Sequence, residues 1–217
     1  MKIINILRFV LAAHLVGLYS FASAQAPSAM VLSVEGDVSV KVQGKPTKLE
    51  AFTRLLEGDR IDLGKAAKLN MIYTRSSRQE IWTGPGAILA GNTESAAVNG
   101  KPQLEAKQLP AKVAQMMAHT PASDSTGKAG MVRLRAIPQS DAVTSLEKTY
   151  QELRATAAPG DRHPEVYFLA GLYKLGEYDR VTQQIGLFEQ QYPGDESIRM
   201  LAKIYARSID NVRQNSQ

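Results

Sequence analysis

Four basic side chains and one tryptophan are the residues that could bind a ligand. Lys65, Lys68, Arg75 and Arg78 follow one another on two expected neighbouring strands, and Trp82 is the chain's single tryptophan. Grouped lysines and arginines can face an anionic glycan or a lipid headgroup, and an indole ring can stack on a ligand. Exposed basic residues also simply solvate a sheet edge, and for Trp82 a place in the core is favoured. These five residues are the candidate ligand-binding set.

Catalytic and metal chemistry lacks the residues that it needs. The chain has no cysteine, and beyond the first 24 residues its histidines are His119, in a polar stretch, and His163, beside Pro164 at an expected helix start. Neither histidine has a partner at a metal-ligand spacing. The glycines around Gly84 lack the Lys-Ser/Thr that completes a phosphate-binding loop. We therefore expect no catalytic residue, no metal and no cofactor.

The N-terminus has the pattern of an export signal. Lys2 and Arg8 precede an uncharged apolar run that ends in Ala22-Ser23-Ala24. A basic start, a short apolar stretch and an A-x-A site define a secretory signal peptide. The alternative, a membrane anchor, needs about 20 apolar residues. We expect residues 1–24 to be removed after Ala24, and no integral membrane segment to remain in the mature chain.

Composition narrows the class of protein further. Removing residues 1–24 lowers the formal net charge from +5 by two, because Lys2 and Arg8 leave and no acidic residue does. That mild charge is not the clustered basic footprint of a nucleic-acid-binding protein. A cysteine-free exported chain favours a bacterial periplasmic protein, because small secreted eukaryotic domains are usually rich in disulfides.

Residues 30–106 have the two-residue period of β-strands. Residues 38–43 alternate apolar with polar side chains, residues 69–73 and 80–83 are further short strand candidates, and glycine turns separate them. The Asn99-Gly100 pair favours a tight hairpin. Short strands at such spacing predict an all-β domain, with a sandwich, a barrel and a β-solenoid as the open alternatives.

The rest of the chain changes to a linker and then to helices. We expect residues 107–140 to be a linker that could hold a short helix after Pro110 and a strand at 131–136. In residues 141–212 apolar side chains recur every three or four positions, with breaks at Pro159-Gly160, Gly176 and Pro193-Gly194. Asp141 or Ser140 is the expected N-cap of the first helix. Four amphipathic helices joined by short turns predict two antiparallel helical hairpins, so the fold class is α+β.

The β half resembles the FecR domain of bacterial periplasmic proteins. The resemblance rests on residues 34–38 (VEGDV), 56–61 (LEGDRI), Gly64 and 82–86 (WTGPG), and it covers roughly residues 30–105. FecR-type sigma regulators carry a cytoplasmic segment and a transmembrane helix before this domain, whereas a signal peptide stands here. The resemblance therefore implies the periplasmic module alone, without direct control of a sigma factor.

The helical half resembles tetratricopeptide repeats. Residues 169–179 (LAGLYKLGEYD) are similar to the first helix and turn of such a repeat, and Pro193 closes the second helix at the expected distance. Stable arrays usually need about three repeats. One repeat with a flanking helix on each side is short, so we expect these helices to pack on one another or on the β domain.

Together these features predict an exported, non-enzymatic interaction protein. The expected partner is an envelope protein or peptidoglycan, with no nucleic acid, and the sequence leaves the oligomeric state open. The alternative is a periplasmic sensory component that relays a signal through a separate membrane protein. In the first interpretation the β domain binds an envelope component and the helical hairpins dock a second protein.

Overall fold

The computed structural model describes residues 26–42, 44–123 and 139–215. The predicted signal peptide and the predicted strand at 131–136 lie outside these residues. Ten strands come first in the described chain: β1 Ala29–Glu35, β2 Val38–Val42, β3 Lys45–Lys48, β4 Arg54–Leu55, β5 Arg60–Leu63, β6 Lys68–Tyr73, β7 Arg78–Thr83, β8 Gly86–Ala90, β9 Ser95–Gly100 and β10 Gln103–Gln108.

The strands form two antiparallel sheets of five. Sheet A has the order β10-β7-β6-β1-β4, and sheet B has the order β3-β2-β5-β8-β9. The two sheets share a core of alternating inward side chains, with Val31 and Leu69 from sheet A and Ile61 and Ile88 from sheet B. The structure therefore has the two-sheet arrangement, and the barrel and solenoid alternatives were wrong.

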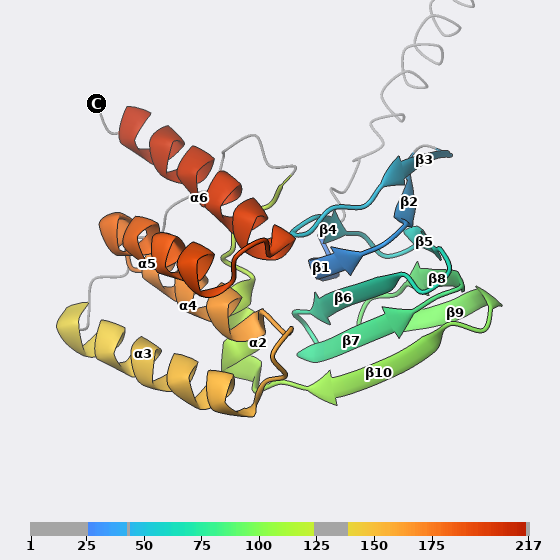
Figure 1. The fold of residues 1–217 in the computed structure, drawn as a ribbon, viewed down its shortest axis with the longest axis horizontal. Helices are drawn as coiled ribbons and strands as arrows, with labels where there is room; N and C mark the ends of the chain where they lie inside the picture. Colours follow the sequence, from blue (N-terminus) through green and yellow to red (C-terminus); the bar gives the residue numbers. More distant parts are fainter. Residues whose placement is uncertain (1–25, 43, 124–138, 216–217) are drawn as a thin grey trace, which may run out of the picture.

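Strand β1 is buried on both faces, which makes sheet A the middle of three layers. Ala29 and Val31 point into the core shared with sheet B, whereas Met30 and Leu32 belong to the core shared with the helices. Figure 1 shows sheet B on the far side of sheet A from the helices. A continuous apolar run is what a strand covered on both faces requires.

The Asn99-Gly100 pair does not make a hairpin. Strands β9 and β10 flank it but belong to different sheets, so the predicted tight hairpin was wrong. Gly100 has a positive φ of 72°, and a Cβ on it would lie 2.9 Å from the Cα of Gly86. Glycine is needed here because the chain turns from one sheet to the other against another backbone segment.

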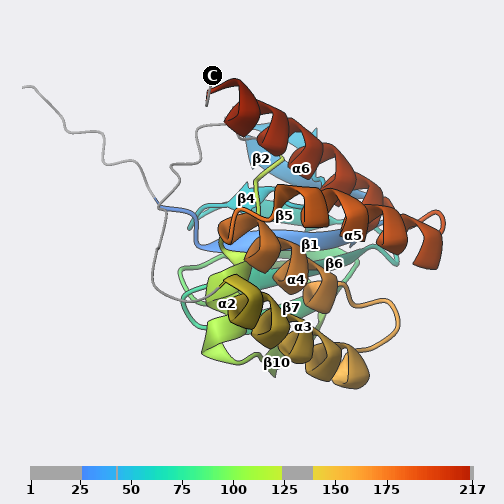
Figure 2. The same cartoon turned by 90° about the vertical axis from the view of Figure 1, so that its left-hand side faces the viewer.

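Five helices cover the outer face of sheet A (Figures 1 and 2). They are α2 Ala111–Met117, α3 Gln139–Thr156, α4 His163–Lys174, α5 Tyr178–Gln191 and α6 Glu196–Gln214. Helix α2 confirms the short helix expected after Pro110. Helix α3 begins before Ser140, so Asp141 lies in its first turn and neither residue is the predicted N-cap. The predicted breaks at Gly160, Gly176 and Gly194 all separate helices.

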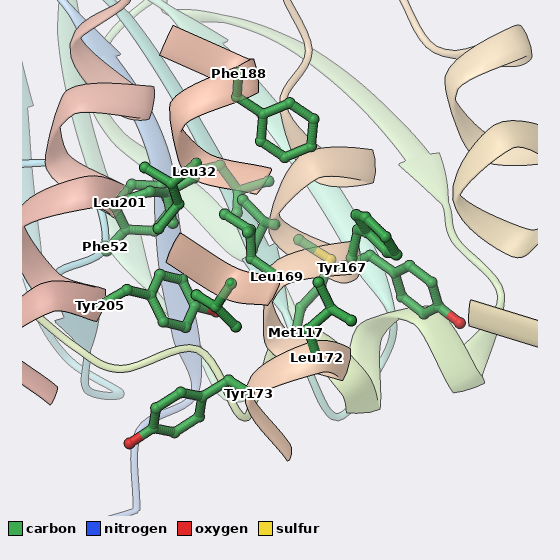
Figure 3. Packing of buried hydrophobic residues seen from close by; sticks show 14 of the residues in the cluster. Leu32, Phe52, Met117, Tyr167, Leu169, Leu172, Tyr173, Phe188, Leu201 and Tyr205 are labelled. Carbon is green, nitrogen blue, oxygen red and sulfur yellow. The ribbon is translucent and has the colours of Figure 1, made fainter. Parts of the chain in front are cut away.

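The helices and the sheet share one hydrophobic core. Leu32 and Phe52 from the β half pack with Met117 of α2 and with Leu169 and Leu201 of α4 and α6 (Figure 3). This confirms that the helices pack on each other and on the β half. Helix α4 is buried along its whole length except for its last residue, Lys174. The helical face toward the sheet is therefore occupied, and the exposed side chains of the helices lie mainly on α3, α5 and α6.

Candidate functional site

The five residues predicted to bind a ligand do not form one surface. Lys65 and Lys68 are exposed at the start of β6, whereas Arg75 and Arg78 lie beyond its far end, about 17 Å away along the strand. Arg75 donates a 2.9 Å hydrogen bond to Asn92. The structure thus separates the predicted basic group into two pairs at opposite ends of sheet A.

Arg78 and Trp82 donate hydrogen bonds to a buried carboxylate inside the β sandwich. Glu80 is fully buried and accepts bonds from Arg78 Nε at 2.7 Å, from Trp82 Nε1 at 2.9 Å and from the Ser95 backbone N–H at 3.2 Å. Trp82 is only 3% exposed. Of the two roles considered for Trp82, the structure shows the core role, so its ring offers no face for ligand stacking.

A groove of about 690 Å³ lies where sheet A meets the start of α6. Its strand wall is residues 33–35 of β1 with the adjoining Gly36, and residues 48–51, which lead from β3 toward β4. Its helix wall is the first turns of α6, from Asp195 to Lys203, and Gly160 closes one side. Figure 1 shows the first turn of α6 beside β1. Both halves of the chain are needed to form this groove, which we name the β1–α6 groove.

The strand wall of the β1–α6 groove has an open backbone edge. Strand β4 pairs with β1 only at Ala29 and Met30, and the adjoining residues bond Val31 at 3.0 and 2.8 Å. Beyond Val31, no described strand pairs with β1 on that side, although β6 still pairs with it on the other. Alternate residues of an antiparallel strand point their N–H and C=O groups to opposite neighbours. Some backbone groups of residues 33–36 therefore face the groove.

Charged side chains of both signs line the two walls. Glu35, Lys48 and Glu50 stand on the strand wall, and Arg199 and Lys203 stand one helical turn apart on α6. Arg199 makes a 3.7 Å contact with Glu196 at an exposed position. Such an exposed pair holds its side chains weakly. Arg199 can consequently turn toward a ligand.

A buried ionic cluster around Asp161 fixes the loop that closes the groove. Asp161 is 4% exposed and accepts bonds from Lys107 Nζ at 2.7 Å and from Gln79 Nε2 at 3.1 Å. The Nδ1 atom of His163 lies 3.0 Å away. Burial alone would raise the pKa of Asp161, but His163 and Lys107 outweigh it and hold the pKa below its ordinary value. These bonds tie the loop that carries Gly160 to sheet A.

A second contact ties the same loop to the helix wall. The Nε atom of Arg162 donates to Asp195 Oδ2 at 2.8 Å, and the guanidinium lies 3.8 Å from the centre of the Tyr192 ring. The other oxygen of Asp195 caps α6 by accepting from the backbone of Ser197 and Ile198. The first turn of α6, and with it Arg199, is therefore set by the loop.

Glu165 is the remaining buried carboxylate of the helical half. Arg154 Nη1 donates to both of its oxygens at 3.1 Å, and the hydroxyl of Tyr192 donates at 3.0 Å. Burial is the main cause that raises the pKa of Tyr150 and of Tyr192, and the negative Glu165 adds to it. Glu165 therefore joins α3, α4 and the end of α5 rather than facing the groove.

Sequence reasoning missed the groove and all three buried carboxylates. The turn from Pro159 to Pro164 was treated as a chain break, although its run of Asp161, Arg162 and His163 is unusually polar for a turn between apolar helices. That density of charge was the one sequence signal that could have indicated the buried cluster. The bonding partner Gln79 lies 82 residues earlier, so no local pattern could have identified it.

Membrane-spanning helices and metal-ligand clusters are both absent from the described residues. No helix among them is both long and apolar enough to cross a membrane. Within the same residues, no group of three or more His, Cys, Asp or Glu side chains could hold a metal ion. No protein-family model, curated protein or solved structure matches the chain.

Proposed function

We propose that this chain is an exported, non-catalytic binding protein of the bacterial cell envelope, and that it recognises a protein partner in the β1–α6 groove. One observation carries the proposal: the groove combines an open strand edge with side chains of both charges. Its walls come from both halves of the chain, held together by a common core. Such a preformed cleft binds without first ordering its own residues.

The side chains favour a protein over a cell-wall glycan. Trp82, the single tryptophan, is buried, and the basic residues predicted to meet a polyanion are divided between the two ends of β6. The groove instead offers backbone groups beside Glu35, Glu50 and Lys203. A polypeptide can match both the backbone groups and the charges.

We propose a non-catalytic role because the buried carboxylates link parts of the fold. Glu80, Asp161 and Glu165 each bind an arginine or lysine at 3.1 Å or less. None of the three is among the residues that line the groove. A general acid or base must be within reach of the substrate, and these groups are committed elsewhere.

Photo-cross-linking inside the cell tests the proposal. A photoreactive amino acid replaces Glu50 in the groove, and in a matched control it replaces Glu147, which is exposed on α3. We expect a discrete protein adduct from position 50, little or none from position 147, and loss of the adduct in the Arg199→Glu/Lys203→Glu double variant. Equal adducts at both positions, or none at position 50, would overturn the proposal.

A further inference from the structure

We infer that the partner enters the β1–α6 groove as an extended polypeptide segment that adds to residues 33–35 of β1 as a further strand of sheet A. This rests on the proposed function and names the chemical class that the groove takes. It also predicts which protein atoms make the contact: backbone N–H and C=O groups of β1, not only side chains.

The first reason is the unfinished pairing of β1. Strand β4 ends its pairing with β1 at Met30, and residues 52 and 53 bond only as far as Val31. The remaining edge of β1 runs along the groove wall. Strand addition satisfies such an edge with main-chain hydrogen bonds, while flanking side chains supply specificity.

The second reason is that this edge lacks the protection seen at β3 and β10. Strand β3 carries Lys45, Pro46 and Lys48 and is exposed throughout, and β10 is equally exposed and carries Glu105 and Lys107. Proline and charged residues are common protection against pairing at an edge. Strand β9 lacks this protection, but the groove lies along β1, where α6 and residues 48–51 stand on either side of an added strand.

The third reason is the distribution of charge on the walls. Glu35 and Glu50 lie on the strand wall, and Arg199 and Lys203 lie on the helix wall. Side chains of a bound strand alternate between two faces. We therefore expect the bound segment to carry basic residues toward Glu35 and Glu50 and acidic residues toward Arg199 and Lys203.

A peptide selection tests strand addition directly. The chain from residue 26 to residue 217 is used to select from a displayed library of random peptides about ten residues long. The best binder is then remade with alternate backbone amides N-methylated, in the two possible phases. We expect one phase to weaken binding about tenfold or more, because it removes the main-chain donors that face β1, and the other phase to weaken it much less.

Hydrogen exchange locates the bound peptide. We expect slower exchange of backbone amides in residues 33–36 when the peptide is bound, and no change in α3 or at β9. Equal effects of the two methylated phases, protection at β9 or on the outer helices, or no enriched peptide would each overturn strand addition. The proposed function stands or falls separately, on the cross-linked adduct at position 50.

Charge reversal in the groove gives an independent readout. The Arg199→Glu/Lys203→Glu variant should lose affinity for selected peptides that carry acidic residues. The matched control is Lys112→Glu, at an exposed position of α2 outside the groove, and it should bind as the unmodified chain does. If both variants bind equally well, the assigned charge contacts are wrong.

Discussion

Lys107 and Asp161 meet across the boundary between sheet A and the helices, with 2.7 Å between Lys107 Nζ and Asp161 Oδ2. Lys107 lies near the end of β10, and Asp161 lies in the loop before α4. The same carboxylate also accepts from Gln79 of β7. One side chain therefore links two strands to the loop that closes the β1–α6 groove.

Replacing Asp161 with alanine should destabilise the whole chain. The change leaves Gln79 without its acceptor and removes the partner of Lys107, whose side chain is 42% exposed. We expect a loss of about 2–3 kcal/mol in the free energy of unfolding. Removing one member of a buried ionic contact leaves its partners without hydrogen bonds. Urea unfolding measures it. Lys107→Ala is the matched comparison and should cost less than Asp161→Ala, because the buried carboxylate then loses one partner but keeps Gln79 and the His163 contact.

Acid should remove the contribution of Asp161. Its pKa in the folded chain lies below the ordinary value of 3.8. The folded state then binds the proton more weakly than the unfolded state, so the stabilisation is complete above about pH 4 and is lost as the pH falls further. Urea midpoints of the unmodified chain and of Asp161→Asn should therefore converge below pH 4. A stability difference that stays constant from pH 7 to pH 3 would contradict this assignment.

The strands and helices were predictable because their signals are local. Alternating residues in β2 meet core and solvent in turn, those of β6 meet the two cores on either side of sheet A, and proline and glycine mark the helix ends. The Asp161 cluster was not predictable, because it joins residues from three separate segments. Trp82 is an intermediate case: it lies two residues from Glu80, so the same strand face carries both and the indole can bond the carboxylate.

The same reasoning explains why the groove escaped prediction. Its two walls come from β1 and α6, which are at opposite ends of the described chain. The early end of β4 depends on how the segment from residue 48 to residue 53 folds back. Neither the meeting of these two walls nor the early end of β4 produces a periodic pattern in the sequence. The basic residues, by contrast, were close in sequence but were separated by the length of β6.

Two glycine substitutions should act in opposite directions. A Cβ on Gly84 would lie 2.1 Å from the carbonyl oxygen of Gly64, which is backbone and cannot move aside. Gly84→Ala should therefore cost about 2 kcal/mol or more in the free energy of unfolding. Gly186, inside α5, has no atom within 4 Å of an added Cβ, so Gly186→Ala should stabilise by about 0.5–1 kcal/mol. Thermal unfolding of both variants checks the pair.

The signal peptide prediction can be tested by the mass of the exported protein. Ala22 and Ala24 supply the small side chains that cleavage requires. The exported chain should begin at Gln25, and Ala24→Arg should accumulate as the uncut precursor. Intact-mass measurement of both proteins distinguishes the outcomes. A mature N-terminus at Met1 in the unmodified protein would show that the segment is retained as an anchor.

Reversing the groove charges should leave the fold intact, which makes the binding experiments interpretable. Arg199 is 62% exposed, and Lys203 is also exposed. Two opposing effects accompany Arg199→Glu: the negative charge suits the N-terminal turn of α6, but it also repels the neighbouring Glu196. We expect the free energy of unfolding of the double variant Arg199→Glu/Lys203→Glu to stay within about 0.5 kcal/mol of that of the unmodified chain.

Arg162→Ala is the contrasting variant. Because Arg162 is buried and bonds Asp195, this variant should unfold at a clearly lower urea concentration. A double variant as unstable as Arg162→Ala would mean that Arg199 and Lys203 hold the fold rather than a ligand.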